Sequence, residues 1–560
     1  MPLIPFDHYY RYDELTQTLH KLAEEFPGLV EVSSYGKSYE GRDLWAVAVT
    51  NKETGPANEK PAMLVDGNIH ASEVIASMVA LRHLNDLLEG YGKDEDITRC
   101  LDTRAFYIIP RVNVDGAEWA LADNPKFIRS STRPYPFDED ILDGLVAEDI
   151  DGNGQILSMR VADSNGRWKK DAEDPRLMVP RGPTEEGGDY YRLFPEGRIE
   201  NYDGVTVTPR AAKESLDMNR NWPSFWRREH EQQGAGPFPL SEPETHAQAS
   251  FIASHPNIIT WIAGHSFTGV LLRAGFNEPD DAMPINDEQH YKMVGQEGTE
   301  LTGYPAISVF HDFKYGRESI AGSVGWGWDN LGIYLWSPEY WAPYQNAGVT
   351  PPHFGRWLFQ HPPEDQRKML AYSDKDFKGE GFAEWQAFDH PELGPVEIGG
   401  WNLLKFLFNP PESEIEKETA PFCQWFTWQL LMSPRMALRS SKGEKISEET
   451  HLIQVVVENT GYLPSYGSHK ALDLQAVRDV VAEIHLPDGA ELVQGALRAE
   501  HGQLEGRAGK PPITLGAFLS DNTADRLKLE WIVKGAKGRA VDVTIRHDKA
   551  GWVRASLDCD

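Results

Sequence analysis

The residues whose types and spacing most clearly suggest chemistry are His70 and Glu73, which follow an apolar run at 62–65. The helical pattern from about 73 to 88 predicts that both side chains lie on one helix face, within reach of one ion. Imidazole nitrogen and carboxylate oxygen are zinc ligands, and a catalytic zinc typically takes three protein ligands. Because an isolated His-x-x-Glu spacing is common by chance, this pair alone does not establish a metal site.

A third ligand can come from a distant strand end. The apolar run at 258–262 is followed closely by His265. In α/β sheets, ligands collect outside the carboxyl ends of the strands, so His265 should meet His70 and Glu73 at one sheet edge. A buried histidine satisfied by ordinary hydrogen bonds is the alternative for either histidine taken singly.

The elements that must position these residues indicate an α/β domain. Short apolar runs at 62–65, 105–110 and 258–262 read as buried strands, and helical patterns lie between them. This alternation predicts a mixed, mostly parallel central sheet flanked by helices. Leu15, Leu19 and Leu22 recur at helical spacing ahead of it.

Two later stretches have a different character. Residues 134–212 are rich in Asp, Gly, Pro and Arg and predict a long surface insertion. Residues 361–444 predict a helical or irregular extension, with an amphipathic Trp/Leu-rich helix after Pro421 that packs on the first domain. Alternating apolar residues within 445–560 predict an all-β sandwich as a separate domain.

Composition excludes several classes of protein. The 560 residues include 40% hydrophobic residues and carry a net charge of −31, with no dense Lys/Arg block, so a disordered chain and a nucleic-acid binder are not expected. Three scattered cysteines cannot form a disulfide framework. With no apolar run long enough for a membrane span and no visible signal peptide, we expect a cytoplasmic protein. A leader that has been removed is also compatible, and no pattern indicates the oligomeric state.

Further motifs turn the pair and the distant histidine into a recognisable set. Across residues 7–345 the sequence resembles the zinc carboxypeptidase family, the carboxypeptidase A-like metallopeptidases. The resemblance rests on these motifs in the family's order: His70 with Glu73, Asn113-Val-Asp115-Gly116, Asp217-Met-Asn219-Arg220-Asn221, Ser241-Glu-Pro-Glu-Thr245, His265-Ser266, and an apolar strand closing at Glu339. It implies a catalytic domain over 1–360, interrupted by the insertion.

The resemblance also implies roles for the metal ligands and the base. His70, Glu73 and His265 would hold the zinc ion. Glu339 would be the general base, taking a proton from the water that attacks the substrate and giving it to the leaving amine. Metal proximity and burial could move the pKa of this carboxylate towards neutrality.

The substrate contacts that the resemblance implies are polar. Asn219 and Arg220 would bind the terminal carboxylate, because a guanidinium grips a carboxylate with two parallel hydrogen bonds. Arg129 would stabilise negative charge developing on the scissile carbonyl oxygen. Its neighbour Arg133 is a competing assignment, and either arginine could be an ordinary surface charge.

The sequence departs from the family pattern around residues 315–326. An alignment without gaps places Arg317 where the family has a substrate-capping tyrosine, with Tyr315 two residues earlier. The same alignment places Val324 near the floor of the specificity pocket, where it would suit apolar or aromatic C-terminal side chains. An arginine at the rim would instead favour an acidic side chain.

The insertion contains a loop with the alternating oxygens of a calcium site. Asp149, Asp151 and Asn153 precede Gly154 as in the first half of a calcium-binding loop, but the twelfth position is Arg160 rather than a glutamate. Calcium is therefore a second cofactor hypothesis, and an Asp/Gly-rich turn is the alternative.

Taken together, the sequence predicts a zinc carboxypeptidase that acts on peptides with a free C-terminal carboxylate. Two alternatives stay open: a zinc hydrolase of another amide, such as a cell-wall peptide or an N-acyl amino acid, and a non-catalytic binding protein. Because all four of His70, Glu73, His265 and Glu339 are present, the non-catalytic hypothesis is the weaker one.

Overall fold

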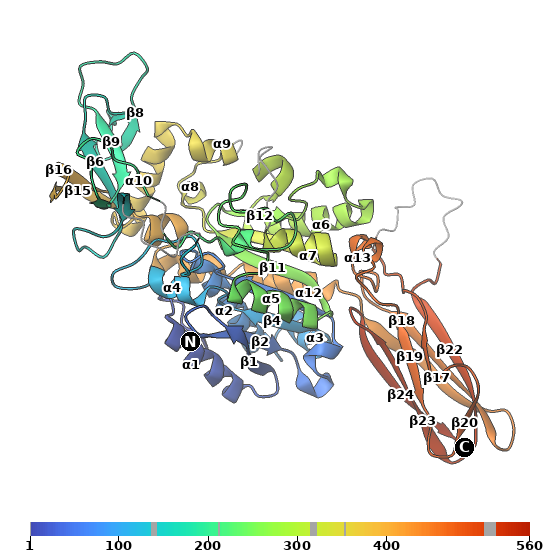
Figure 1. Ribbon diagram of the computed structural model, residues 1–560. Helices are drawn as coiled ribbons and strands as arrows, with labels where there is room; N and C mark the ends of the chain where they lie inside the picture. The colour runs from blue at the N-terminus through green and yellow to red at the C-terminus, as the bar shows by residue number, and fades with distance from the viewer. Residues whose placement is uncertain (1, 136–142, 211–212, 314–321, 352–353, 509–521) are drawn as a thin grey trace.

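The chain forms an α/β body, a smaller lobe at one end and a β-domain that projects from the other end (Figure 1). This computed structural model describes residues 2–135, 143–210, 213–313, 322–351, 354–508 and 522–560.

An eight-stranded mixed sheet forms the centre of the body. Its four central strands are parallel, and the flanking strands add antiparallel pairs, except that the edge strand β13 pairs parallel with β12. In spatial order the strands are β1 (Val30–Lys37), β2 (Asp43–Val49), β4 (Ala105–Ile109), β3 (Ala62–Gly67), β11 (Ile258–Ser266), β14 (Tyr334–Tyr340), β12 (Val270–Arg273) and β13 (Ala306–Ser308). The predicted α/β class with a mixed central sheet is confirmed.

Helices cover both faces of this sheet because its central strands are apolar on both sides. In β3, Met63 and Val65 belong to one hydrophobic cluster, whereas Ala62 and Leu64 belong to the other. The first face packs against α1 (Tyr12–Glu25), α2 (Ile75–Gly90), α3 (Glu95–Thr103), α6 (Ile285–Thr302) and α12 (Phe422–Leu431). The second face packs against α5 (Pro243–Ser254) and α7 (Ser323–Leu331).

Local patterns account for individual helices of the body. In α1, the buried residues are Leu15, Leu19 and Leu22, as their spacing predicts. The helix ends just ahead of Pro27, which disfavours helical geometry in the preceding residue. The helix predicted after Pro421 is α12, which packs on α2, α3 and α6.

The lobe is built jointly by the insertion and the extension. Its six-stranded antiparallel sheet comprises, in spatial order, β15 (Phe382–His390), β16 (Gly394–Trp401), β6 (Ser158–Ala162), β9 (Tyr191–Pro195), β7 (Trp168–Lys170) and β8 (Met178–Pro180), beside a pair formed by β5 (Gly144–Ala147) and β10 (Gly197–Glu200). The expectation of a helical or irregular extension is therefore corrected for residues 382–401. The partners β16 and β6 are distant in sequence, so no local pattern reveals that they pair.

The lobe has a small core of its own. Met159 and Ile199 from the insertion pack with Val396 and Ile398 from the extension. The remaining helices are α4 (Val114–Ala120), α8 (Pro343–Asn346), α9 (Phe354–Phe359), α10 (Pro363–Phe377), α11 (Ile415–Thr419) and α13 (His469–Asp473).

The C-terminal domain consists of two antiparallel four-stranded sheets. The first contains β17 (Met436–Lys445), β18 (Thr450–Asn459), β22 (Arg526–Lys534) and β20 (Glu491–Gln494). The second contains β21 (Arg498–Glu500), β19 (Val481–His485), β23 (Arg539–His547) and β24 (Gly551–Cys559). The alternating buried residues of β18 face a shared core, as the period of two predicts. The domain begins with β17 at Met436, upstream of the predicted boundary at 445, because the exposed polar residues of β17 conceal its strand pattern.

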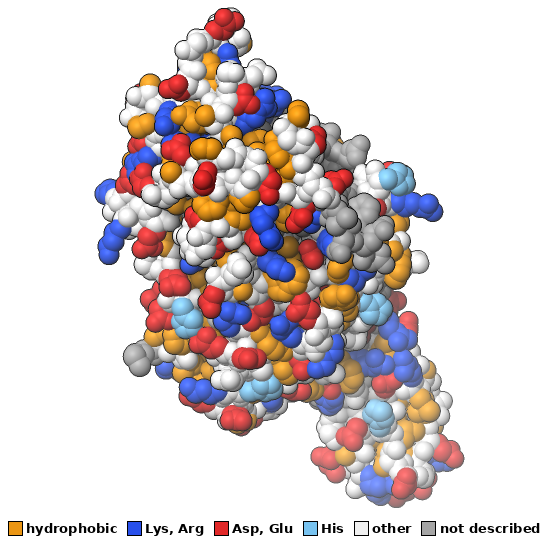
Figure 2. Space-filling view, turned by 60° about the vertical axis from the view of Figure 1, so that its left-hand side comes forward, with side chains coloured by type: hydrophobic (Ala, Val, Ile, Leu, Met, Phe, Trp, Pro, Cys, Tyr) orange, Lys and Arg blue, Asp and Glu red, His pale blue; other side chains and the backbone are white. Residues whose placement is uncertain are grey.

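Acidic and basic side chains are intermixed over the face of the molecule shown in Figure 2. Among the helices of the described residues, none has the length and apolar character needed to span a membrane.

Candidate active site

His70 and Glu73 lie in a tight turn between β3 and α2. The Glu73 backbone N–H donates to the His70 carbonyl (3.2 Å), and α2 begins only at Ile75. The prediction that both residues lie on a helix face is therefore wrong. The turn nevertheless brings the two side chains together, with His70 Nδ1 2.8 Å from Glu73 Oε1.

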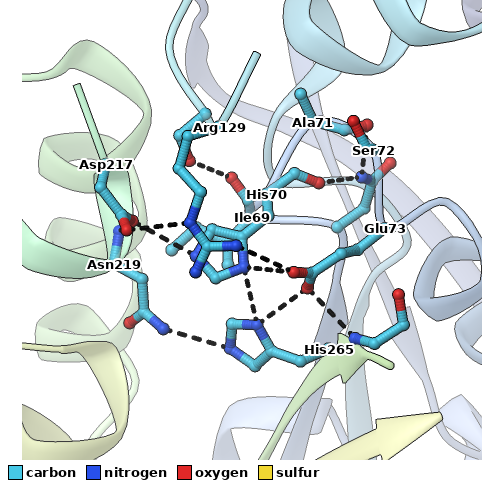
Figure 3. Close-up of polar contacts among 12 residues, drawn as sticks. Ile69, His70, Ala71, Ser72, Glu73, Arg129, Asp217, Asn219 and His265 are labelled. Carbon is cyan, nitrogen blue, oxygen red and sulfur yellow. Dashed lines mark hydrogen bonds and ion pairs between the residues drawn. The ribbon is translucent and has the colours of Figure 1, made fainter. Parts of the chain in front are cut away.

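His265 completes a buried group of three side chains (Figure 3). It lies inside β11, one residue before the strand ends, rather than after the strand as predicted. Its Nδ1 lies 3.1 Å from Glu73 Oε2 and 3.1 Å from Nδ1 of His70. All three ligand atoms lie within 4.8 Å of one another.

This donor set fits zinc. Two imidazole nitrogens and one carboxylate oxygen are a common catalytic zinc set, and tetrahedral bonds of 2.0–2.1 Å would separate neighbouring ligand atoms by about 3.3 Å. The observed separations of 2.8–3.1 Å are close to this value. Burial raises the pKa of Glu73, but the charges and hydrogen bonds of His70 and His265 outweigh it and hold the pKa below its ordinary value.

Asp217 positions the His70 ring, a role that no sequence pattern predicted. Its Oδ1 lies 3.2 Å from Nε2 of His70, on the side of the ring that faces away from Glu73. A carboxylate in this position fixes the ring orientation and tautomer of a ligating histidine. Burial raises the pKa of Asp217, but Arg129, His70 and Arg220 together hold it well below its ordinary value. The only available signal was its place two residues before Asn219.

The structure places Arg129, rather than Arg133, beside the group. Arg129 donates from Nε to Asp217 Oδ2 (3.1 Å) and from Nη1 to Glu73 Oε1 (3.3 Å). Its side chain is 45% exposed, so it can also face a substrate. Arg133 instead forms a bidentate ion pair with the buried Glu242 (2.6 and 3.0 Å), which indicates a structural role.

Two hydrogen bonds to backbone carbonyls fix the Arg129 loop against the turn that holds His70 and Glu73, the candidate metal-ligand turn. The Ala71 N–H donates to the Arg129 carbonyl (3.0 Å), and the Ser130 hydroxyl donates to the Ile69 carbonyl (2.7 Å). Asn113 also holds this loop by donating to the Ser130 carbonyl (2.6 Å).

Asn219 and Arg220 lie in a short helical turn on the Asp217 side of the group. The Asp217 carboxylate caps this turn by accepting from the Asn219 N–H (2.8 Å). The Asn219 amide nitrogen lies 3.3 Å from Nε2 of His265, and Arg220 Nη1 donates to the Asn219 carbonyl (2.8 Å). Burial lowers the pKa of the Arg220 guanidinium, while the charge of Asp217 raises it.

Glu339 lies opposite His265 in the parallel pairing of β14 with β11. Burial raises the pKa of Glu339 to about 7; His265 and Arg129 oppose this shift, and the charge of Glu73 adds to it. A carboxylate whose pKa is close to neutral is well matched to a general base near neutral pH. The sheet thus places this group beside the candidate zinc ligands.

The structure does not describe the side chains of the three residues predicted to set specificity. Tyr315 and Arg317 lie outside the described residues. Val324 belongs to α7, but the position of its side chain is not described.

The calcium hypothesis receives no support from the loop geometry. The Asp149 carboxylate accepts from the backbone N–H groups of Gly152 and Gly154 (2.8 and 2.7 Å), and the Asn153 side-chain oxygen accepts from Gln155 N–H (2.8 Å). The carboxylate that lies close to Asp149 and Asp151 is Glu196, which is itself hydrogen-bonded to backbone N–H groups. These contacts are typical of an Asp/Gly-rich turn whose side-chain oxygens accept hydrogen bonds from nearby backbone N–H groups.

Comparison with known proteins identifies two regions. A family model described as zinc carboxypeptidase matches residues 15–322, and a model described as a domain of unknown function matches residues 435–558. The chain is 36% identical over 114 residues to a zinc carboxypeptidase of Saccharothrix mutabilis subsp. capreolus, covering 20% of this chain and 26% of the relative. It is 24% identical over 334 residues to carboxypeptidase A2 of Rattus norvegicus, covering 59% of this chain and 61% of the relative.

The chain therefore spans less than two thirds of the length of these curated relatives. Among solved structures, bovine thrombin-activatable fibrinolysis inhibitor in complex with tick carboxypeptidase inhibitor is similar at a TM-score of 0.42. That similarity has 17% identity and covers 76% of this chain and 97% of the other.

Proposed function

Because the chain belongs to the zinc carboxypeptidase family, we propose that it removes C-terminal residues from peptides that have a free α-carboxylate. The observation that carries the proposal is the register of β11 with β14, which sets Glu339 beside the buried group of His70, Glu73 and His265. Zinc bound by that group would polarise the scissile carbonyl and lower the pKa of a water molecule.

The protein's own groups account for the proton transfers and the charge. Glu339 takes a proton from the attacking water and delivers it to the leaving amine, which its pKa of about 7 permits near neutral pH. Arg129 stabilises the negative charge that develops on the carbonyl oxygen as the water adds. Its contacts to Asp217 and Glu73 hold the guanidinium beside the reacting centre before substrate arrives.

The choice of a C-terminal bond follows from the Asn219–Arg220 turn. Arg220 can donate two parallel hydrogen bonds to a terminal carboxylate, and the Asn219 amide can add a third. An internal peptide segment offers no charge to this position, so the partly buried guanidinium would lose the hydrogen bonds that a terminal carboxylate supplies. The turn therefore favours peptides that end at this point.

The test is mass spectrometry of a mixed peptide library incubated with zinc-loaded protein. Single-residue losses from free C-termini are expected, and Glu339→Gln should abolish them while zinc stoichiometry stays the same. Absence of cleavage by a zinc-loaded wild type would contradict the proposal. It would then favour another amide substrate or a non-catalytic protein.

A further inference from the structure

A narrow hollow opens on the surface where the body, the insertion and the extension meet. Its walls come from residues 125–127 of the body, 154–156 of the insertion and 402–405 of the extension. The apolar lining residues are Pro125, Phe127, Ile156, Leu403 and Leu404. The family model ends at residue 322, so the extension's part of this wall lies outside the matched region.

Two large apolar side chains in this wall are open to solvent. Phe127 is 40% exposed and Leu403 is 37% exposed. Single exposed apolar residues are ordinary on a protein surface, but these two come from distant segments and line the same hollow. Phe127 is also only two residues from Arg129.

Aromatic contacts connect the hollow with the zinc-ligand group. Phe127 packs edge-on against Phe408 (5.5 Å between ring centroids), and Phe408 packs edge-on against Phe267 (4.7 Å). Phe267 directly follows Ser266, whose backbone N–H donates to Glu73 Oε2 (3.1 Å). A continuous aromatic wall therefore leads from the reacting centre to the hollow.

Buried amides hold the extension segment firmly in this position. Asn409 accepts from the Ile75 N–H (2.9 Å) and donates to the Ser72 carbonyl (2.7 Å), which ties the segment to the metal-ligand turn. At its other end, the Asn402 amide donates to Gln155 of the insertion (2.9 Å). The segment is therefore anchored at both ends, so the wall exists before any substrate binds.

The direction of the substrate follows from the same anchors. Figure 3 shows Asn219 and Ser72 on opposite sides of the group formed by His70, Glu73 and His265. A peptide whose terminal carboxylate lies at Asn219 must extend its preceding residues away from that side. In the proposed binding mode those residues leave the reacting centre on the Ser72 side, where Asn409 holds the extension.

We propose that the hollow beside Phe127 and Leu403 is a subsite for an apolar side chain on the amino side of the scissile bond. This subsite rests on the proposed function. It specifies the substrate class as peptides of three or more residues with an aliphatic or aromatic residue upstream of the scissile bond. Burying such a side chain against the wall increases kcat/KM for these peptides, and the insertion and extension supply the selectivity.

The experiment compares peptides of two to six residues that share one C-terminal residue and carry leucine or serine at each upstream position. At one of the upstream positions, the wild type should cleave the peptides with leucine about 10-fold better than those with serine, the scale expected for one apolar contact. Leu403→Asp should remove this preference and leave kcat/KM for the dipeptide unchanged. The matched control is Leu472→Asp, a 39%-exposed helical leucine in α13 of the C-terminal part, and it should preserve the preference.

A second readout separates the subsite from hydrolysis. Calorimetric binding of the preferred leucine peptide to zinc-loaded Glu339→Gln should weaken about 10-fold when Leu403→Asp is added. If the wild type cleaves peptides but Leu403→Asp keeps the preference, or lowers dipeptide cleavage equally, the subsite is refuted while the proposed function stands. If the wild type cleaves nothing, the proposed function fails, and equal binding of leucine and serine peptides would refute the subsite as well.

Discussion

Replacing Asp217 with asparagine should weaken zinc binding without unfolding the protein. The two carboxylate oxygens of Asp217 serve different partners, His70 Nε2 at 3.2 Å and Arg129 Nε at 3.1 Å. Asparagine is uncharged and has one acceptor oxygen, so it cannot serve both. A hydrogen bond to a charged group contributes about 1.5–3 kcal/mol. Because 1.4 kcal/mol corresponds to a factor of ten, we expect loss of the hydrogen bond to His70 to weaken zinc affinity about 10–100-fold.

The assay is competition for zinc with a chromophoric chelator, which does not depend on catalysis. Asp115→Asn is the matched control, because Asp115 is also a buried carboxylate but accepts from Ser38, Glu40 and Arg42 rather than from the metal-ligand residues. That control should lower thermal stability and preserve zinc affinity. A folded Asp217→Asn protein with wild-type zinc affinity would refute the orienting role of Asp217.

Three further predictions concern recognition, pH and metal removal. Arg220→Ala should lower kcat/KM for a peptide acid by about 10–100-fold through loss of charge-assisted hydrogen bonds; an equal loss on the corresponding C-terminal amide, measured in parallel, would contradict carboxylate recognition. Burial raises the pKa of Glu244 to about 7, with Asp115 and Glu242 adding to the shift against opposing backbone hydrogen bonds. This value is above the ordinary 4.5, so the unfolded chain binds fewer protons between these pH values and stability falls as pH rises through them. In urea unfolding, Glu244→Gln should therefore have a free energy of unfolding about 3 kcal/mol higher than the wild type at pH 8, and little higher at pH 4.5. An equal increase at both pH values would argue against this. Zinc at 100 times its Kd should raise the free energy of unfolding of the wild type by about 2.7 kcal/mol. If thermal scans showed that zinc stabilises His265→Ala to a comparable extent, the metal would bind elsewhere.

Three of the four parallel central strands were predictable from local sequence because they are short apolar runs with a clear boundary. The runs at 62–65, 105–110 and 258–262 became β3, β4 and β11. Two boundaries were displaced for local reasons. The turn that holds His70 and Glu73 delays α2 to Ile75, and β17 begins at Met436 among residues that are mostly polar and exposed.

The lobe could not be predicted in the same way. Strand β6 from the insertion pairs with β16 from the extension, and the six strands described in the insertion are short. Each segment alone buries too little apolar surface to show a strong periodic pattern. The core that joins them exists only after the two distant segments have met.

The sequence by itself determined which residue types stand at the ends of the central strands, because alternating and continuous apolar runs specify strands locally. It therefore indicated His70, Glu73 and His265 as candidate metal ligands, and the resemblance to zinc carboxypeptidases added Glu339 to this set. The tertiary structure decided which groups surround that set. It selected Arg129 over Arg133, gave Asp217 its partners and placed residues 402–409 beside the turn. These choices depend on sheet register and on contacts between distant segments, and neither leaves a periodic signal in the local sequence.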